Sequence, residues 1–178
     1  MNKIVQLFGQ HHTTEIKERV DISSFRCDII RPALKVCDLW STAAENLLLG
    51  TALAESGLRV VKQMKGGDAL SFFQVEPKTY IDCLRYLSTP RCKHLKDKIL
   101  AACFMDVFPD ASALQWNLRL ATLIARTKYW MKKEPLPESN DADGLCKYYK
   151  KHYNTSLGKA TFEKAIVHFN KSCKETGE

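Results

Sequence analysis

The sequence predicts a mainly α-helical domain with one small β-hairpin after a central helix. Several segments space their apolar side chains with helical periodicity, and Gly and Pro, which number 8 and 6, are scarce for an all-β protein. Over 58–76 the apolar period changes around Gly66 and Gly67, which suit a turn. We expect residues 1–24 to form an N-terminal arm and residues 25–178 to form a single domain.

Composition excludes several classes of protein. The chain has 178 residues, of which 45% are hydrophobic and 26% are charged, as is typical of a globular domain that buries its own core. No apolar run approaches the roughly 20 residues that a membrane helix needs, so we expect no membrane insertion. The net charge of +7 favours a polyanionic partner, such as nucleic acid, an anionic membrane face or an acidic cell-wall polymer, and solubility alone explains it equally well.

The seven cysteines are scattered and odd in number. No pair has CxxC spacing, so the sequence predicts no structural metal, and we expect no cofactor. The first ten residues contain no sustained apolar stretch, so no signal peptide is predicted. An odd cysteine count without such a signal is typical of a reducing compartment, where no structural disulfide is expected.

Two segments carry helical periodicity at the start of the domain. Residues 25–40 repeat apolar side chains near helical spacing. The stronger signal covers 43–55, where Thr42 and Glu45 are spaced as a capping box and Gly57 is suited to end the helix. Because this helix is apolar on nearly every side, we expect it to lie buried at the centre of the domain.

The predicted hairpin follows the central helix, with a short extended arm on each side of Gly66 and Gly67. Two strands alone are marginally stable, so we expect the hairpin to rest on helices, and Pro77 suits the first turn of the next one. Turn signals separate five further predicted helices, which cover 77–88, 92–106, 111–133, 141–152 and 159–173.

Glu55 is the strongest candidate for a catalytic residue. It ends a strongly apolar helix, where its carboxyl group is partly desolvated and faces the negative end of the helix dipole. Both effects raise the pKa of a carboxyl group and favour its protonated form near neutral pH, as a general acid requires. The simpler explanation is a solvated Glu at a helix end.

Gln74 and Glu76 are candidate sugar-binding residues. In an extended arm their side chains face the same side, and an amide suits hydroxyl groups because it both donates and accepts hydrogen bonds. Tyrosines and lysines over 148–155, including Tyr153 and Asn154, suit stacking on sugar rings or binding of nucleic acid. The solvent face of a strand and a basic helix end explain the same two patterns without a ligand.

Taken in order, these pieces resemble the lysozyme-like lytic transglycosylases. That family has a helix ending in Glu-Ser, a GLMQ-type motif, an Asn-bearing helix and a Tyr-Asn motif. The resemblance covers roughly residues 43–155 and implies a lysozyme-like α+β fold. The matching positions are Glu55-Ser56, Leu70-Ser71-Phe72-Phe73-Gln74, Asn117 and Tyr153-Asn154.

A closer likeness is to phage-encoded proteins of this group. They carry an ESGL…KQ…GG.AL…Q.EP.T block and a late EPLP…YYK.HYNT.LG block, and this sequence contains both, over 55–79 and 134–158. It departs from the family at Ser71, where a Gly usually precedes the aromatic residue. It departs again at Thr155-Ser156, where active cellular enzymes have Ala-Gly.

The resemblance implies a peptidoglycan-cleaving enzyme. In lytic transglycosylases one Glu, here Glu55, protonates the glycosidic oxygen between N-acetylmuramic acid and N-acetylglucosamine. The same Glu then acts as the base on the muramoyl C6 hydroxyl, giving a 1,6-anhydro product. A Glu76 across the cleft would also permit hydrolysis, if the two carboxyl groups leave room for a water molecule. The implied substrate-binding residues are Ser56, Gln74, Glu76, Asn117, Tyr153 and Asn154.

Three readings of function follow from the sequence. The first is a phage enzyme that degrades the cell wall, with peptidoglycan glycan strands as its partner. The second is a catalytically weak structural protein of the virion on the same fold, in contact with other virion proteins. The third, least favoured, is an unrelated helical module that uses the +7 charge to bind nucleic acid. For the first two we expect the phage virion, or the host cytoplasm before delivery to the periplasm.

Overall fold

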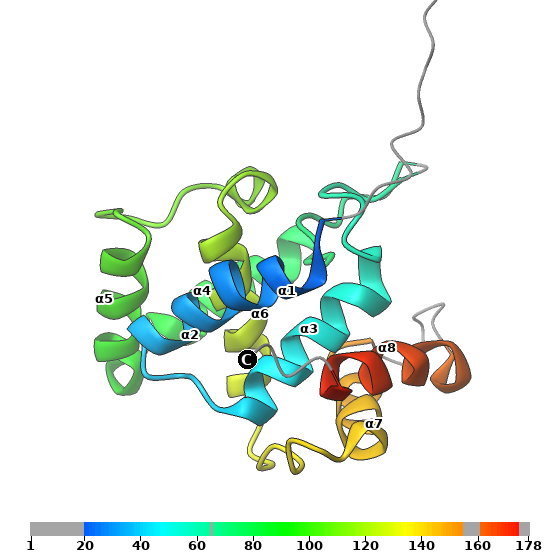
Figure 1. The fold of residues 1–178 in the computed structure, drawn as a ribbon. Coiled ribbons are helices and arrows are strands. Elements are labelled where there is room, and N and C mark those ends of the chain that lie inside the picture. The colour runs from blue at the N-terminus through cyan, green and yellow to red at the C-terminus, as the bar shows by residue number, and fades with distance from the viewer. Residues whose placement is uncertain (1–19, 65, 155–160, 175–178) are drawn as a thin grey trace, which may run out of the picture.

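The computed structural model describes residues 20–64, 66–154 and 161–174, and within them the chain is mainly helical (Figure 1). Residues 1–19, most of the predicted arm, and 155–160, which include part of the late motif block, lie outside the described residues. In chain order the elements are α1 (Ile22–Ser24), η1 (Phe25–Ile30), α2 (Arg31–Val36), α3 (Thr42–Ser56), α4 (Pro77–Leu87), η2 (Pro90–Cys92), α5 (Lys93–Ala102), η3 (Ala111–Gln115), α6 (Leu118–Trp130), α7 (Ala142–His152) and α8 (Phe162–Lys174).

Helix α3 lies at the centre of the fold, as its sequence predicts. Every residue from Ala44 to Leu53 is buried, including Glu45 and Thr51. Helices α7 and α8 pack on one side of α3, and α5 lies at the opposite end of the molecule (Figure 1). Gly57 ends the helix in the left-handed conformation, with φ 61°, as predicted. Glu55 is thereby placed in the last turn of the central helix.

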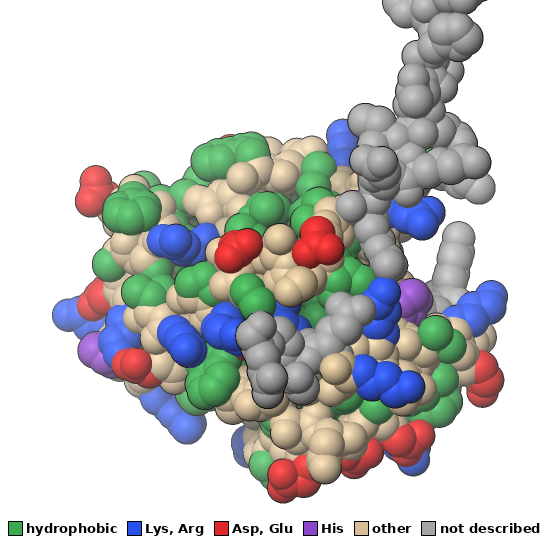
Figure 2. Space-filling model, viewed as in Figure 1, with side chains coloured by type: hydrophobic (Ala, Val, Ile, Leu, Met, Phe, Trp, Pro, Cys, Tyr) green, Lys and Arg blue, Asp and Glu red, His purple; other side chains and the backbone are tan. Residues whose placement is uncertain are grey.

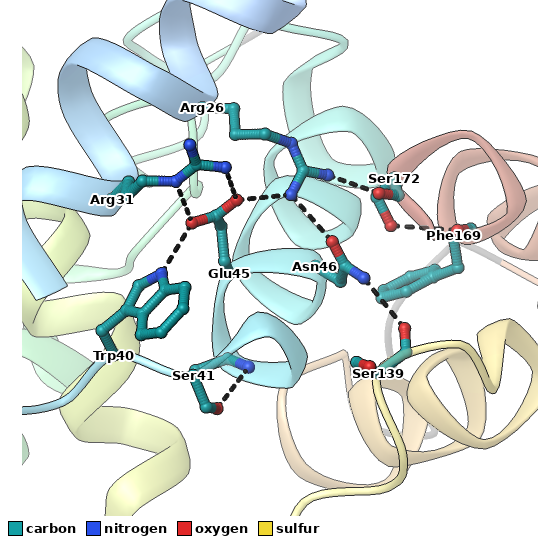
Figure 3. A network of polar contacts seen from close by, with 10 residues as sticks. Arg26, Arg31, Trp40, Ser41, Glu45, Asn46, Ser139, Phe169 and Ser172 are labelled. Atoms are coloured by element: carbon teal, nitrogen blue, oxygen red, sulfur yellow. Dashed lines mark hydrogen bonds and ion pairs between the residues drawn. The ribbon is translucent and has the colours of Figure 1, made fainter. Parts of the chain in front are cut away.

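The predicted capping box at the start of α3 is wrong. The N-cap is Ser41, whose Oγ accepts a hydrogen bond from the backbone N–H of Ala44 at 3.1 Å. Glu45 does not reach back to the helix start, because its carboxylate is engaged by side chains from α2 and its neighbours. Its Oε1 accepts from Arg26 at 2.6 Å, and its Oε2 accepts from Trp40 at 2.8 Å (Figure 3).

The buried carboxylate of Glu45 is the centre of a polar network that joins distant segments. Arg31 donates to both of its oxygens, each at 2.9 Å. Arg26 also donates to Asn46 Oδ1 at 2.8 Å and to the backbone carbonyl of Ser172 in α8 (Figure 3). The network therefore fastens η1, α2 and α8 to the central helix.

The predicted β-hairpin is wrong, since the described residues contain no β-strand. The segment forms only two isolated antiparallel bridges, Lys62 with Leu70 and Leu70 with Val75. Its second arm is not extended, because Ser71 and Gln74 adopt φ values of 66° and 48° and turn the chain back on itself. The expectation that residues 72–76 alternate between two faces fails for the same reason.

Two other predicted helices are shorter than expected. Helix α5 ends at Ala102, and Phe104 two residues later has a φ of 57°, which a helix cannot accommodate. The predicted helix over 111–133 is divided into η3 and α6 at Asn117, whose side chain accepts from the N–H of Leu120 at 2.9 Å. Helices α4 and α7 lie as predicted, within one residue at each end.

Gly50 allows α8 to approach the central helix closely. A Cβ atom added at Gly50 would lie 2.5 Å from ring carbons of Phe169, which is fully buried. Gly-to-Ala in a helix interior normally stabilises by about 1 kcal/mol. Here we expect Gly50→Ala to destabilise the protein by about 1–3 kcal/mol in urea unfolding, because the clash outweighs the gain. Adding Phe169→Leu should recover part of this loss, and a Gly50→Ala protein as stable as the wild type would contradict the packing.

Within the described part of the chain, no helix is long and apolar enough to cross a membrane. The described residues also show no group of three metal-ligating side chains, and all seven cysteines are free.

Candidate functional site

Glu55 lies where the central helix reaches the surface. The apolar residues before it anchor α3 in the core, and the left-handed Gly57 after it turns the chain away. Its side chain is partly buried rather than solvated. The sequence predicts that Glu55 lies at the end of this apolar helix, and it leaves open whether the carboxyl group there is desolvated or solvated.

Two groups at the end of α7 donate to the same oxygen of Glu55. Tyr149, 94 residues later in the chain, donates its hydroxyl to Oε1 at 2.9 Å. Asn154 donates its amide Nδ2 to the same oxygen at 3.4 Å, while its Oδ1 accepts from Lys150 at 2.7 Å. The lysine thus fixes which end of the Asn154 amide faces the carboxyl group. Among the described residues, no hydrogen bond reaches Oε2.

Lys128 of α6 brings a positive charge close to this cluster. Its Nζ donates to the backbone carbonyl of Tyr153 at 3.0 Å and lies 3.7 Å from the centre of the Tyr153 ring. Burial lowers the pKa of Lys128, and the carboxylates of Glu55 and Glu76 oppose that fall. The charges of Glu55 and Glu76 therefore both act on Lys128.

The pKa of Glu55 is raised above its ordinary value. Burial is the main cause, because it penalises the charged carboxylate. The hydrogen bonds from Tyr149 and Asn154 and the charges of Lys128 and Lys150 act in the opposite direction but do not cancel it. Burial and the nearby Glu55 carboxyl raise the pKa of Tyr149 above its ordinary value, so Tyr149 stays protonated and remains a hydrogen-bond donor.

Ser56 and Tyr153 fix the loop before α4 against the end of α3. Ser56 Oγ donates to the carbonyl of Phe72 at 2.8 Å, and the Tyr153 hydroxyl donates to the carbonyl of Phe73 at 2.8 Å. Gln74 lies in this loop, and its Nε2 donates to the carbonyl of Ser71 at 2.7 Å. The side chains of Ser56, Gln74 and Tyr153 are therefore engaged with backbone.

The other two predicted residues lie differently. Glu76 is exposed at the N-cap of α4 without making a capping hydrogen bond. Asn117 caps the far end of α6, eleven residues before Lys128, which is about 16 Å along a helix. The structure thus brings Glu55, Tyr153 and Asn154 together, places Ser56, Gln74 and Glu76 beside them, and leaves Asn117 apart.

Sequence reasoning included Tyr149 only in the stretch suited to stacking, without linking it to Glu55, and it missed Lys128. Tyr149 and Tyr153 are four residues apart, so a helix through both presents them on one face, and this spacing was available as a signal. Their rings are stacked with centroids 6.2 Å apart. Lys128 is one of few charged residues in a largely buried helix, which is the only sequence signal for it.

A cavity of about 360 Å³ lies elsewhere, beside α5, and none of the predicted site residues lines it. Comparisons of the chain with protein-family models, curated protein sequences and solved structures found no match. The candidate site around Glu55 therefore stands on its own geometry and on the motif order in the sequence.

Proposed function

We propose that the protein cleaves the glycan strands of peptidoglycan, with Glu55 as the proton donor to the glycosidic oxygen. The observation that carries this proposal is a carboxyl group whose pKa is raised by burial while Tyr149 of α7 and Asn154, just after α7, hold one of its oxygens. A general acid at neutral pH needs such an elevated pKa and a fixed orientation.

The two oxygens of Glu55 have different roles in this proposal. Oε1 is occupied by Tyr149 and Asn154, so a proton on the carboxyl group is best placed on Oε2. Oε2 receives no hydrogen bond from a described residue and is free to donate. Lys128 limits how far the pKa rises, which keeps the carboxylate accessible for the second half of a reaction that needs a base.

The motif order supports a transglycosylase course. Glu55 donates its proton to the glycosidic oxygen as the bond from that oxygen to C1 of the muramoyl residue breaks. The carboxylate then takes the proton of the muramoyl C6 hydroxyl, whose oxygen bonds to C1 and closes the 1,6-anhydro ring. The Glu55 proton is restored. The reaction consumes no water molecule and requires no second carboxylate and no metal.

The neighbouring residues have supporting roles in this proposal. Asn154 and Tyr149 hold Glu55, while Ser56 and Tyr153 hold the loop that carries Gln74. The amide of Gln74 is bonded on its nitrogen side, which leaves its oxygen to accept from a sugar hydroxyl.

Mass spectrometry of the fragments released from purified peptidoglycan tests the proposal. Anhydro-muramoyl ends are expected, and reducing ends would indicate hydrolysis. Release of no fragment at all, by folded protein over a range of pH, would contradict enzymatic cleavage.

Glu76→Gln separates the two reaction courses. A transglycosylase needs only Glu55, so we expect the variant to retain its rate within about threefold and to yield anhydro product. A hydrolase that uses Glu76 to activate water should lose most of its rate. The rate and the end group of each fragment are read from the same digest.

A second candidate is a structural protein of the phage particle on the same fold. It is favoured by the engagement of Ser56, Gln74 and Tyr153 with backbone carbonyls, which serves the fold without any ligand. A zymogram with peptidoglycan distinguishes the two candidates, because only the enzyme clears the substrate.

A further inference from the structure

A cavity of about 360 Å³ opens beside α5. Helix α5 lies at the end of the molecule away from α7 and α8 (Figure 1). The cavity is formed where the loop after α2, the end of α4, η2, α5 and the end of α6 meet. None of the residues around Glu55 takes part in it. Its walls consist of Cys37, Asp38, Leu39, Tyr86, Arg91, Cys92, His94, Leu95, Lys98 and Trp130.

The charged groups of this cavity favour an anion. Arg91, His94 and Lys98 line it, and Asp38 is the only acidic residue among its described lining. Asp38 pairs with Lys98, whereas Arg91 forms no ion pair with a described carboxylate. Figure 2 shows Lys and Arg side chains over this end of the molecule, where α5 lies in Figure 1, with Asp and Glu side chains among them.

The start of α5 adds to the positive potential. Its first turn contains no acidic residue, and its N-cap, Cys92, makes no side-chain hydrogen bond to the free backbone N–H groups. The helix dipole places partial positive charge at this end, where Lys93 and Lys96 add full charges. A helix start of this kind is a favourable position for an anion.

Two aromatic side chains give the cavity flat walls. Trp130 is 45% exposed although it is one of the largest apolar side chains, and it lines the cavity together with Tyr86. The guanidinium of Arg126 lies 5.1 Å from the centre of the Trp130 ring and holds that ring in place. Arg126 is buried, and its Nε has no hydrogen-bond partner among the described residues.

We propose that this cavity binds a nucleotide, a phosphate ester that carries a sugar and a planar base. Arg91, Lys98 and His94 suit the phosphate, since arginine and lysine are the usual partners of phosphate oxygens. Trp130 and Tyr86 offer rings on which a base stacks. The carboxylate of Asp38 can accept hydrogen bonds from sugar hydroxyls, as acidic residues do in other nucleotide sites.

The full set of groups distinguishes a nucleotide from a simple anion. A free phosphate ion would use the cations and leave the aromatic walls without a role. The cavity volume also lies within the range of small-molecule sites, well above the space that one inorganic anion fills.

Titration of the full chain with AMP tests the site, followed by the NMR signal of the Trp130 indole N–H and by calorimetry. We expect saturable binding with Kd below about 1 mM, and binding at least about tenfold weaker for adenosine and for inorganic phosphate. No saturation by about 10 mM AMP, or inorganic phosphate bound as tightly as AMP, would overturn the proposal.

Two matched variants separate a site from diffuse attraction. Arg91→Ala removes an exposed cation that lines the cavity, and Lys164→Ala removes an exposed cation of α8 that does not. We expect AMP binding to weaken about fivefold or more in the first and less than about twofold in the second. Equal losses in the two variants would show that only net charge attracts the nucleotide and would overturn the site.

A short single-stranded oligonucleotide identifies the source of the ligand. If a free nucleotide is the ligand, the oligonucleotide should bind no more tightly than AMP. If the ligand is instead the terminal nucleotide of a strand, the oligonucleotide should bind more tightly than AMP, and its binding should depend on salt. Arg91→Ala should weaken that binding too. Binding of the oligonucleotide that Arg91→Ala leaves unchanged, with no binding of AMP, would overturn the proposal.

Discussion

Glu55→Gln is expected to abolish cleavage of peptidoglycan while leaving the fold intact. Glutamine has nearly the same size and can still accept the hydrogen bonds of Tyr149 and Asn154, but it has no proton to transfer. General acid catalysis contributes about 10²–10⁴-fold to a rate, so a loss of at least that size is expected. The rate of fragment release from purified peptidoglycan measures it, with circular dichroism to confirm folding.

Glu138→Gln provides the matched control, because it makes the same charge change at an exposed residue outside the cluster. It should leave the rate unchanged. Retained activity in a folded Glu55→Gln protein would remove Glu55 from the mechanism. The wild-type rate should fall as pH rises through the pKa of Glu55, which burial places above its ordinary value, because the acid must be protonated to act.

Glu45→Ala is expected to destabilise the protein by about 3–5 kcal/mol, because it leaves the fully buried guanidinium of Arg26 without its carboxylate partner. Arg31 and Trp40 lose their acceptor in the same change. Urea unfolding followed by circular dichroism measures the loss.

The double variant Arg26→Met with Glu45→Leu should be more stable than Glu45→Ala alone, since no buried charge is then left unpaired. A loss below about 1 kcal/mol in Glu45→Ala would show that the network contributes little.

The same carboxylate makes stability depend on pH. Burial alone would raise the pKa of Glu45, but the hydrogen bonds from Arg31, Trp40 and Arg26 outweigh it and lower the pKa. A lowered pKa in the folded state means that Glu45 stabilises the protein above its unfolded pKa. That contribution is lost as pH falls through the folded value. The part of acid destabilisation that belongs to Glu45 should therefore be absent from Glu45→Ala.

The helical class and the central helix are confirmed because they depend on local properties of the chain. A helix as apolar as the stretch from Leu47 to Leu53 is expected to be buried in any fold. Gly57 ends the helix because glycine readily adopts the left-handed conformation. The predicted β-hairpin does not form, because Ser71 and Gln74 adopt left-handed conformations. The pattern of apolar side chains does not predict a left-handed backbone conformation at two non-glycine residues.

The predicted capping box does not form, for a related reason. Thr42 and Glu45 have the correct spacing, and Ser41 is an equally good cap by sequence. Glu45 does not take part in the cap because Arg26 and Arg31 bind its carboxylate in a buried network. These arginines come from a different helical segment.

The sequence by itself determined that Glu55 ends a buried apolar helix, and it left open whether the carboxyl group there is desolvated or solvated. Only the tertiary structure decided what surrounds it. Tyr149 and Asn154 follow Glu55 by 94 and 99 residues, and their contacts depend on how α7 packs against α3. Periodicity along a chain reports which face of one helix is buried, whereas the meeting of two helix ends is set by the packing of the whole core.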